Sequence, residues 1–358
     1  MSTITKPMLL DETGQEILAA MKEQTKVLKR IAGLDSSVAI VTNWAEIHKA
    51  VRNGKASTMF EIGDQIVVRW TNVANESYYE MPFDVVHFGD VKLEDGSTVP
   101  GMYLQCHYMP AVSIPFDAGE GTYMMPGMTY ESGFYYYAMS VNGARLLVEG
   151  TDYNVGDTIP SGSSTIMRNA IYDESGGIIN GGYNKWSASA IRQLLNSNAV
   201  DGNWWSSQHD GDSAGVAIMP GTGVTAGFLS GFEVDFLDCI KAVEVCTVSE
   251  GAVDITYDKF FIPSLEQMNV ESEVSGEGET FEYWREATGD QGVVTPAVGH
   301  EAYISYRISA KSTPANYFFR STIQTNKHQL YSVNSGGEIV AANASNNSCG
   351  CLPVCVIC

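Results

Sequence analysis

The sequence predicts an α+β chain in which strands outnumber helices. Its 35 Gly, 18 Tyr and 6 Trp in 358 residues favour strands joined by tight turns. The hairpin dipeptides Asp95-Gly96 and Asn142-Gly143 lie between apolar runs. Helical periodicity is limited to the N-terminus and three short segments. We therefore expect an oligomerising helix over residues 1–36, a β-rich base module over 37–160 and a further domain over 161–358.

The first part carries a heptad pattern. Its seam residues recur at alternating steps of about four and three, a spacing that predicts a coiled coil, and Gly33 ends the helix. The predicted oligomerisation residues are Leu10, Ile17, Met21, Gln24, Leu28 and Ile31. We expect a homo-oligomer, with a trimer favoured and a dimer left open. The alternative is an amphipathic helix that packs on its own domain.

The base module is predicted to be antiparallel. Asn43 is a suitable cap for a short helix that ends near Gly54. Strands are expected at residues 60–70, 83–88, 102–108 and 133–139, the first broken by a turn at Gly63-Asp64. No alternation of strands and long helices, which a parallel sheet would require, is present.

A segment rich in Gly and Ser, residues 161–183, is predicted to connect the base module to the last domain. That domain begins with a helix at 187–197, followed by a second helix near 230–242. From residue 247 onward we expect short strands and loops.

Charge excludes several classes of partner. The chain has 42 acidic and 21 basic side chains, a net charge of −21. Nucleic acids and anionic membranes select basic surfaces, so neither is expected as a partner. No apolar run approaches the roughly 18 residues of a membrane-spanning helix, so no membrane insertion is expected. The N-terminus lacks a secretion signal, which favours a protein made in a cytoplasm with reduced thiols.

No motif indicates catalysis, a metal or a cofactor. The six histidines stand singly, and a phosphate loop, a zinc-protease motif and a nucleophile elbow are missing. Residues 209–213 (HDGDS) suit a solvated turn better than a calcium loop. Glu277, Glu279 and Glu282 are interpreted as an exposed acidic loop. Four cysteines among the last ten residues have no zinc-site spacing, so we expect buried small side chains.

The second half also carries a succession of short motifs. They are residues 183–197 (YNKWSASAIRQLLNS), Asn203-Trp204-Trp205, 227–232 (GFLSGF), 258–264 (DKFFIPS), 317–321 (YFFRS), 333–337 (VNSGG), Ala344-Ser345 and 350–356 (GCLPVCV). Over roughly residues 40–358 the chain resembles a family of gut bacterial and phage proteins with a C-type-lectin-like domain, related to the formylglycine-generating-enzyme fold. The resemblance implies that residues 161–358 form such a domain. Phe318-Phe319 and Cys351-Leu352-Pro353 depart from the family's usual Trp-rich and Val-Arg-Pro-like runs.

Some members of that family resemble the variable proteins of diversity-generating retroelements. Residues 316–350 have a similar composition, with many Asn, Ser and Thr between aromatic and Gly positions. The resemblance implies that Tyr317, Phe319, Arg320, Gly337, Gly350 and Pro353 are scaffold. It implies a ligand-binding face made of Thr322, Gln324, Lys327, His328, Gln329, Tyr331, Glu338, Asn343 and Asn346. The alternative is an ordinary polar loop.

Together these features predict a phage virion protein, not an enzyme, that is made in the cytoplasm of the bacterial host. Its expected partners are other copies of itself, other virion proteins and a host cell-surface protein or glycan. One alternative is a purely structural capsid or tail decoration protein. The other is a formylglycine-generating-enzyme-like enzyme that would use Cys349 and Cys351 as its reactive pair.

Overall fold

The structure is a computed structural model of the chain. It describes residues 38–40, 44–72, 76–111, 114–117, 122–132, 136–140, 143–161, 166–168, 182–200, 204–205, 224, 226–289 and 293–358. The predicted coiled coil lies outside the described residues, as do all of its seam positions, Leu10, Ile17, Met21, Gln24, Leu28 and Ile31. The turn at 209–213 also lies outside them.

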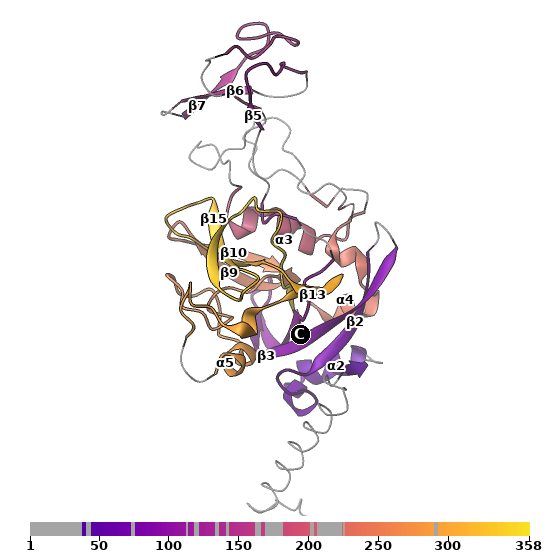
Figure 1. Cartoon of the computed structure of the whole chain (residues 1–358). Coiled ribbons are helices and arrows are strands. Elements are labelled where there is room, and N and C mark those ends of the chain that lie inside the picture. Colours follow the sequence, from indigo (N-terminus) through magenta and orange to yellow (C-terminus); the bar gives the residue numbers. More distant parts are fainter. Residues whose placement is uncertain are drawn as a thin grey trace, which may run out of the picture.

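The largest sheet joins strands from both ends of the chain. Its six strands lie in the order β1-β2-β3-β4-β17-β11, and Figure 1 labels β2 and β3 in it. They are β1 (Val38–Ile40), β2 (Gln65–Asn72), β3 (Ser77–Lys92), β4 (Thr98–Cys106), β17 (Val354–Ile357) and β11 (Phe260–Phe261). Only the β1–β2 pairing is parallel within this sheet. All four residues of β17 are buried, as expected for a short apolar strand with a partner on each side.

This sheet crosses the domain boundary that we predicted at residue 160. One hydrophobic core runs from Ile47 in the first half to Ile357 in the last strand. Cys355 pairs with Leu104 on β4 and with Phe260 on β11, so the chain's end holds the two halves together. The predicted base module and the predicted C-terminal domain therefore share a sheet and a core.

A smaller module stands apart from this body, at the top of Figure 1. Its four strands lie in the order β5-β8-β6-β7. They are β5 (Thr122–Met124), β6 (Tyr136–Ser140), β7 (Gly143–Leu147) and β8 (Ile166–Arg168). Tyr130, Tyr136 and Tyr153 form the centre of its separate core. The predicted connection at 161–183 therefore contributes a strand, β8, which pairs with both β5 and β6.

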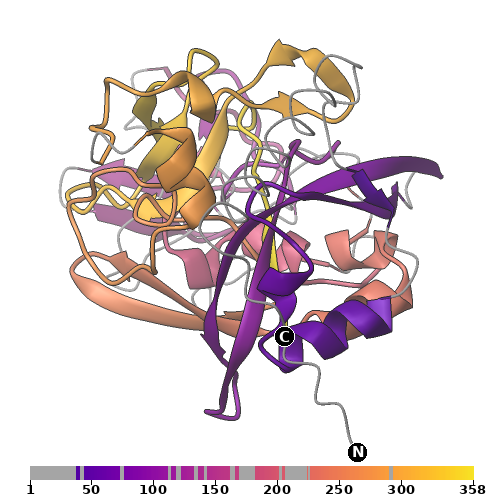
Figure 2. The ribbon, with the colours of Figure 1, turned by 90° about the horizontal axis from the view of Figure 1, so that it is seen from below.

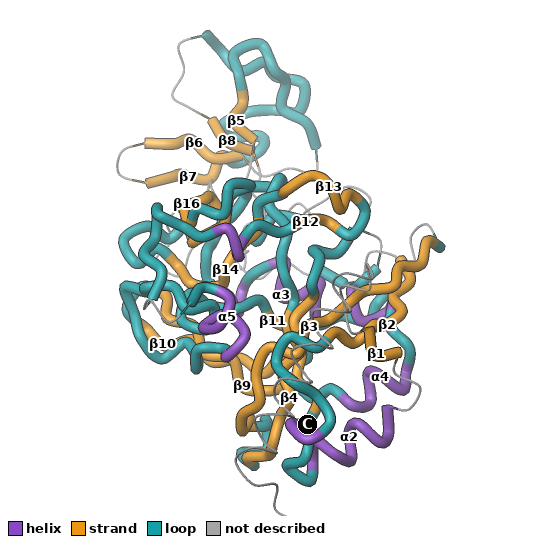
Figure 3. Tube along the Cα trace, turned by 60° about the horizontal axis from the view of Figure 1, so that its bottom comes forward, coloured by secondary structure: helices purple, strands orange, loops and turns teal. Residues whose placement is uncertain are grey.

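The helices are short and lie dispersed among the strands (Figure 3). Helix α2 (Trp44–Arg52) confirms the predicted helix and buries Ile47 and Val51. Helix α2 lies beside the C-terminus (Figure 2), where Nε2 of His48, in the middle of the helix, is 2.8 Å from the Cys358 carbonyl oxygen. The other helices are α3 (Ala190–Leu195), α4 (Val234–Cys239) and α5 (Glu282–Ala287), with 3-10 turns η1 (Ala56–Thr58), η2 (Trp186–Ala188), η3 (Phe228–Gly231) and η4 (Glu301–Tyr303).

Two of these helices are shorter than predicted because 3-10 turns occupy part of each segment. Helix α3 begins after Ser189, whose hydroxyl accepts a hydrogen bond from the Arg192 amide, as an N-cap should. Helix α4 ends at Cys239 because residue 243 already starts strand β9.

Three further small sheets complete the second half. The hairpin β9 (Val243–Ser249) and β10 (Ala252–Asp258) packs beside β14. Strands β12 (Tyr306–Arg307) and β13 (Ala310–Pro314) form a second hairpin. Strands β14 (Tyr317–Thr322), β15 (Gln329–Val333) and β16 (Ile339–Asn343) form an antiparallel sheet. The described fold is thus α+β and rich in strands, as predicted, while the C-type-lectin-like fold stays a prediction.

Candidate functional site

The β15–β16 hairpin brings several predicted contact residues to one place. Its register pairs Gln329 with Asn343 and Tyr331 with Ala341. Side chains two residues apart share a face of a strand, so Gln329, Tyr331 and Asn343 lie on the same face. Gln329 Nε2 donates a hydrogen bond to Asn343 Oδ1 over 3.2 Å.

An open hollow of about 510 Å³ lies at this hairpin. We call it the amide hollow, and its lining residues are Asn316, Gln329, Ser332, Val340, Ala341, Ala342, Asn343, Ser345, Asn346 and Cys349. Three of the nine predicted contact residues are among them. None of the lining side chains is charged, and four carry amides that can both donate and accept hydrogen bonds. The hollow therefore suits an uncharged, polar ligand.

Two predicted contact residues lie elsewhere, against the β9–β10 hairpin. Thr322 is buried, and its hydroxyl donates to the Val248 carbonyl over 2.9 Å. Gln324 Nε2 donates to the same carbonyl over 2.8 Å, and Gln324 Oε1 accepts from the Gly251 amide over 3.0 Å. These groups fasten the end of β14 to the neighbouring hairpin. Thr322 therefore does not belong to an exposed face, because strand β14 is covered on both sides.

Lys327 and His328 bind the segment that precedes η2. The Lys327 carbonyl accepts from the Asn184 amide over 3.0 Å. His328 Nδ1 lies 3.1 Å from the Gly182 carbonyl oxygen. Both residues are half-buried at the rim of the sheet, so their main role in this structure is to hold the loop before β15.

The two remaining contact residues lie farther along the hairpin. Burial, followed by the neighbouring Glu273 carboxylate, raises the pKa of Tyr331 to about 12, so its hydroxyl stays protonated at neutral pH. Glu338 is exposed in the turn between β15 and β16, where its carboxylate accepts from Asn334 Nδ2 over 2.8 Å. Neither lines the amide hollow.

Arg320 anchors the sheet from inside, as its predicted scaffold role requires. It is 1% exposed, and its guanidinium donates to four oxygens. They are the carbonyl of Cys246 at 3.3 Å, the carbonyl of Ile262 at 2.8 Å, Gln267 Oε1 at 2.6 Å and the carbonyl of Glu277. Burial lowers the pKa of Arg320 to about 10, although the Glu277 carboxylate opposes the shift. The guanidinium remains charged at neutral pH.

Glu277 corrects the prediction of an exposed acidic loop. Its side chain turns inward and is 1% exposed. The carboxylate accepts from the Val248 amide over 2.9 Å and from the Ser321 hydroxyl. Burial raises the pKa of Glu277, although Arg320 opposes the shift. The flanking Gly276 and Gly278, with φ of 95° and 132°, were the available sequence signal for this inward turn.

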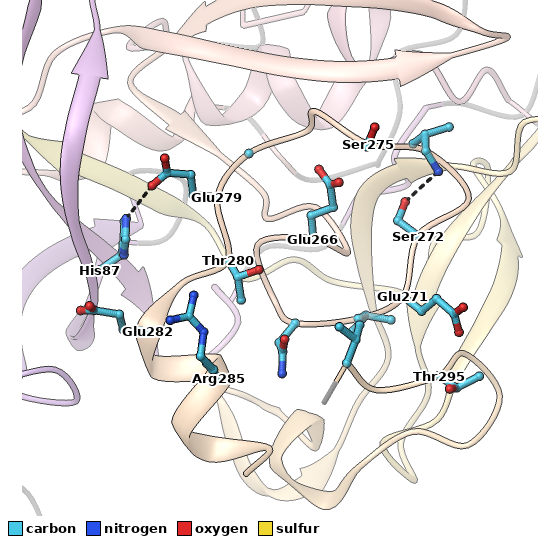
Figure 4. Close-up of a pocket in the computed structure, with 15 residues that line it drawn as sticks. His87, Glu266, Glu271, Ser272, Ser275, Glu279, Thr280, Glu282, Arg285 and Thr295 are labelled. Atoms are coloured by element: carbon cyan, nitrogen blue, oxygen red, sulfur yellow. Dashed lines mark hydrogen bonds and ion pairs between the residues drawn. The ribbon is translucent and has the colours of Figure 1, made fainter. Parts of the chain in front are cut away.

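Glu279 and Glu282 border a second, larger hollow of about 1010 Å³ (Figure 4). His87 reaches it from β3, with its Nε2 3.6 Å from a Glu279 carboxylate oxygen. Burial lowers the pKa of His87, although Glu282 and Glu279 oppose the shift. The Glu266 carboxylate, which also lines this hollow, accepts hydrogen bonds from the main-chain amides of Gly276 and Glu277. Sequence reasoning missed this hollow because β3 and the loop are about 190 residues apart.

The described residues hold no group of three or more His, Cys, Asp or Glu side chains that could bind a metal ion. All seven cysteines are free, and six are buried. Burial raises the pKa of Cys349 to about 11 and that of Cys351 to about 12. Because the thiolate is the reactive form, neither thiol is activated. Cys355 lies in β17 and is buried as a small core side chain, as predicted for the C-terminal cysteines.

No helix among the described residues is long and apolar enough to cross a membrane. Comparison with curated proteins finds no match, and comparison with solved structures finds none either. Residues 161–358 match a family described as a domain of unknown function, DUF6273. The match covers more than half of the chain and includes the Arg320–Glu277 centre and the amide hollow. The chain therefore belongs to the DUF6273 family.

Proposed function

We propose that this chain is a phage virion protein that displays the β15–β16 hairpin for binding to a receptor on the host cell surface. The observation that carries the proposal is the amide hollow. There Gln329, Asn343 and Asn346, which sequence reasoning selected as contact residues, line one open surface. The surface is uncharged although the chain carries −21, so it differs chemically from the rest of the protein.

The hairpin suits display because its supporting residues are separate from its exposed ones. Leu330, Val333 and Ile339 are buried, whereas Ala341 and Asn343 are exposed. Substitutions at exposed positions usually change stability by only about 0.5 kcal/mol. This division supports the further proposal that the segment 316–350 is diversified at its exposed positions. It is also compatible with the proposed C-type-lectin-like fold, which places loops on small antiparallel sheets.

Several copies acting together would strengthen a weak contact. The proposed N-terminal coiled coil would supply these copies, with a trimer favoured. Linking binding sites raises overall avidity by roughly 100- to 10,000-fold without any new contact. A small polar hollow can therefore serve attachment even when each copy binds weakly.

Cell binding by one substituted variant tests the proposal. Asn343→Arg places a long charged side chain in the amide hollow at an exposed position. Thr98→Arg, at an exposed position of the β3–β4 hairpin, is the matched control. We expect labelled full-length protein to bind a subset of gut bacterial strains, with binding of the Asn343→Arg variant reduced by about tenfold or more. Equal binding by both variants would show that this hairpin is not the receptor site.

A decoration protein is the second candidate. The observation that favours it is the exposed apolar pair Val253 and Ile255 on β10, which are 66% and 51% exposed. Such a pair suits packing against another virion protein. A reconstruction of the virion separates the two functions, because decoration alone would bury the amide hollow in an interface while receptor binding requires it to face outward.

The encoding locus tests diversification independently. We expect a near-copy of the codons for residues 316–358, differing at adenines, beside a reverse transcriptase gene. A locus with neither feature would limit the proposal to an invariant binding surface.

A further inference from the structure

Strand β16 leaves one edge of its sheet open. The bonds from the Asn334 amide to the Glu338 carbonyl (2.9 Å) and from the Ala344 amide to the His328 carbonyl (2.8 Å) fix which pairs exchange hydrogen bonds. In an antiparallel ladder, hydrogen-bonded pairs alternate with pairs that are not hydrogen-bonded. The main-chain N–H and C=O groups of residues 340 and 342 therefore point toward β15. The main-chain groups of Ala341 and the amide of Asn343 consequently point away from β15.

At each end of this open edge, an outward main-chain carbonyl accepts a hydrogen bond from within the protein. The Ile339 carbonyl accepts from the Ala297 amide over 2.9 Å. The Asn343 carbonyl accepts from the Asn346 amide, also over 2.9 Å. Between them, no residue in the described part of the chain hydrogen-bonds the outward Ala341 amide and carbonyl or the Asn343 amide. Ala341 and Asn343 are exposed and both line the amide hollow, so these three main-chain groups lie at its border.

Resting on the proposed function, we infer that the receptor group bound at the amide hollow is an extended, uncharged protein segment that pairs with β16 as an additional strand. Two donors and one acceptor at the spacing of a strand edge match the main chain of an extended peptide. The amides of Asn316, Gln329 and Asn346 then surround its neighbouring groups. Each main-chain hydrogen bond changes affinity by roughly 2- to 13-fold, so three give weak binding that needs several copies.

The lining of the amide hollow determines the charge of this occupant. A charged peptide segment would find no counter-ion among the lining side chains. An uncharged segment avoids this cost, and the oligomeric state of the wild type distinguishes it from a second copy of the chain.

Ala341→Pro is the sharpest variant. Proline removes the outward amide and places its ring where the added strand would lie. The ladder to β15 does not use the Ala341 amide, so the hairpin itself should persist. Ala341→Val is the matched control, because it adds bulk at the same position and keeps the amide.

The probes are peptides from a random twelve-residue library. The library is first depleted on the full-length Asn343→Arg variant and then selected on the full-length wild type, so that retained peptides need the amide hollow. We expect retained peptides to lose about tenfold or more in affinity for Ala341→Pro and less than about threefold for Ala341→Val. N-methylation of the central peptide amides should abolish binding to the wild type. This ligand-side change tests the inference even if Ala341→Pro does not fold.

Three results would overturn the inference. The first is that no peptide is retained, or that retained peptides tolerate N-methylation and Ala341→Pro alike. The second is that a neutral oligosaccharide such as chitohexaose binds the wild type and Ala341→Pro equally but not Asn343→Arg. The third is a wild-type oligomer that Ala341→Pro dissociates, which would assign the edge to a second copy. Cell binding that still depends on Asn343 would leave the proposed function intact in the first two cases.

Discussion

Replacing Arg320 by methionine should be among the most destabilising single substitutions in strand β14, all of whose residues are buried. The substitution keeps most of the unbranched stem but removes every donor of the guanidinium. The carbonyls of Cys246 and Ile262 then lose the guanidinium as a donor. Gln267 Oε1 and the Glu277 carbonyl lose it too, and each keeps one longer hydrogen bond, from the Ser264 amide (3.2 Å) and the Ser264 hydroxyl (3.4 Å) respectively. The Glu277 carboxylate stays buried without its nearest positive charge.

The size of the effect follows from these losses. Each unsatisfied buried acceptor costs about 1 kcal/mol or more. The variant regains part of this cost because it no longer buries a guanidinium. Removing one partner of a buried charged pair costs about 3–5 kcal/mol in total. We therefore expect Arg320→Met to lower the free energy of unfolding by about 4 kcal/mol, a large share of the stability of a typical domain.

Urea unfolding followed by tryptophan fluorescence measures this change, because Trp186 and Trp284 are buried in the body. Arg285→Met is the matched control, since Arg285 is exposed on α5 and should cost about 0.5 kcal/mol or less. The double variant Arg320→Met, Glu277→Gln should recover about 1 kcal/mol, because it no longer leaves a buried carboxylate unbalanced. A loss for Arg320→Met that equals the Arg285→Met control would refute this account of the buried centre.

Three further predictions concern other buried groups. Because burial in the folded state raises the pKa of Glu277 above its usual 4.5, the contribution of Glu277 to stability falls as pH rises above about 4.5. Glu277→Gln should lack this slope, so its stability relative to wild type in urea unfolding should increase as pH rises above that value. A thiol reagent should react with Cys246 alone in the native protein, since the other six thiols are buried; rapid reaction of two or more thiols would contradict the packing of the C-terminal strand. A side chain at Gly227 would overlap the backbone of Ser197, so Gly227→Ala should cost about 2 kcal/mol, whereas Gly336→Ala, whose nearest neighbour would be 3.3 Å away, should melt close to wild type.

Local signals in the sequence predicted local structure well. The apolar spacing before Gly54 predicted α2, and the apolar spacing within 187–197 predicted the helix in which α3 lies, although α3 starts later than predicted. The dipeptide Asp95-Gly96 lies in the turn that joins β3 to β4, as predicted. Each of these features depends on residues within about ten positions of one another, which is the range over which capping, turn chemistry and periodicity act.

Pairings over long sequence distances could not be predicted in the same way. Strand β17 lies next to β4, about 250 residues earlier, and nothing in the run Val354–Ile357 specifies that partner. The predicted boundary at residue 160 coincides with the start of the DUF6273 match at residue 161, and the sequence did not show that the parts on either side of it share a sheet and a core. The inward turn of Glu277 likewise depends on Arg320 and Ser321, which lie more than 40 residues away.

The candidate site was predicted in part for a related reason. The predicted contact residues Gln329 and Asn343 lie together because the register of the β15–β16 hairpin pairs them on one face. Strand β14 does not alternate, because all six of its residues are buried and its pairing with β15 shifts register between Phe318 and Thr322. A pattern of polar residues alone therefore could not show that Thr322 faces inward.

The C-terminal segment thus consists of two buried strands, β14 and β17, with the partly exposed β15–β16 hairpin between them. Strands β14 and β17 are buried throughout, and β14 carries Arg320, so changes there act on the core of the whole body. Strand β16 has a free edge, and the four residues that follow Ile339 in it are exposed or half-buried, so changes there act mainly on the surface. If residues 316–350 are diversified, selection for folding must confine accepted changes to positions such as Ala341 and Asn343. The open edge would persist through such variation, because main-chain hydrogen bonds do not depend on side-chain identity. The varied side chains would then determine which extended partner binds, while the main-chain groups at the edge of β16 would contribute part of the affinity for every partner.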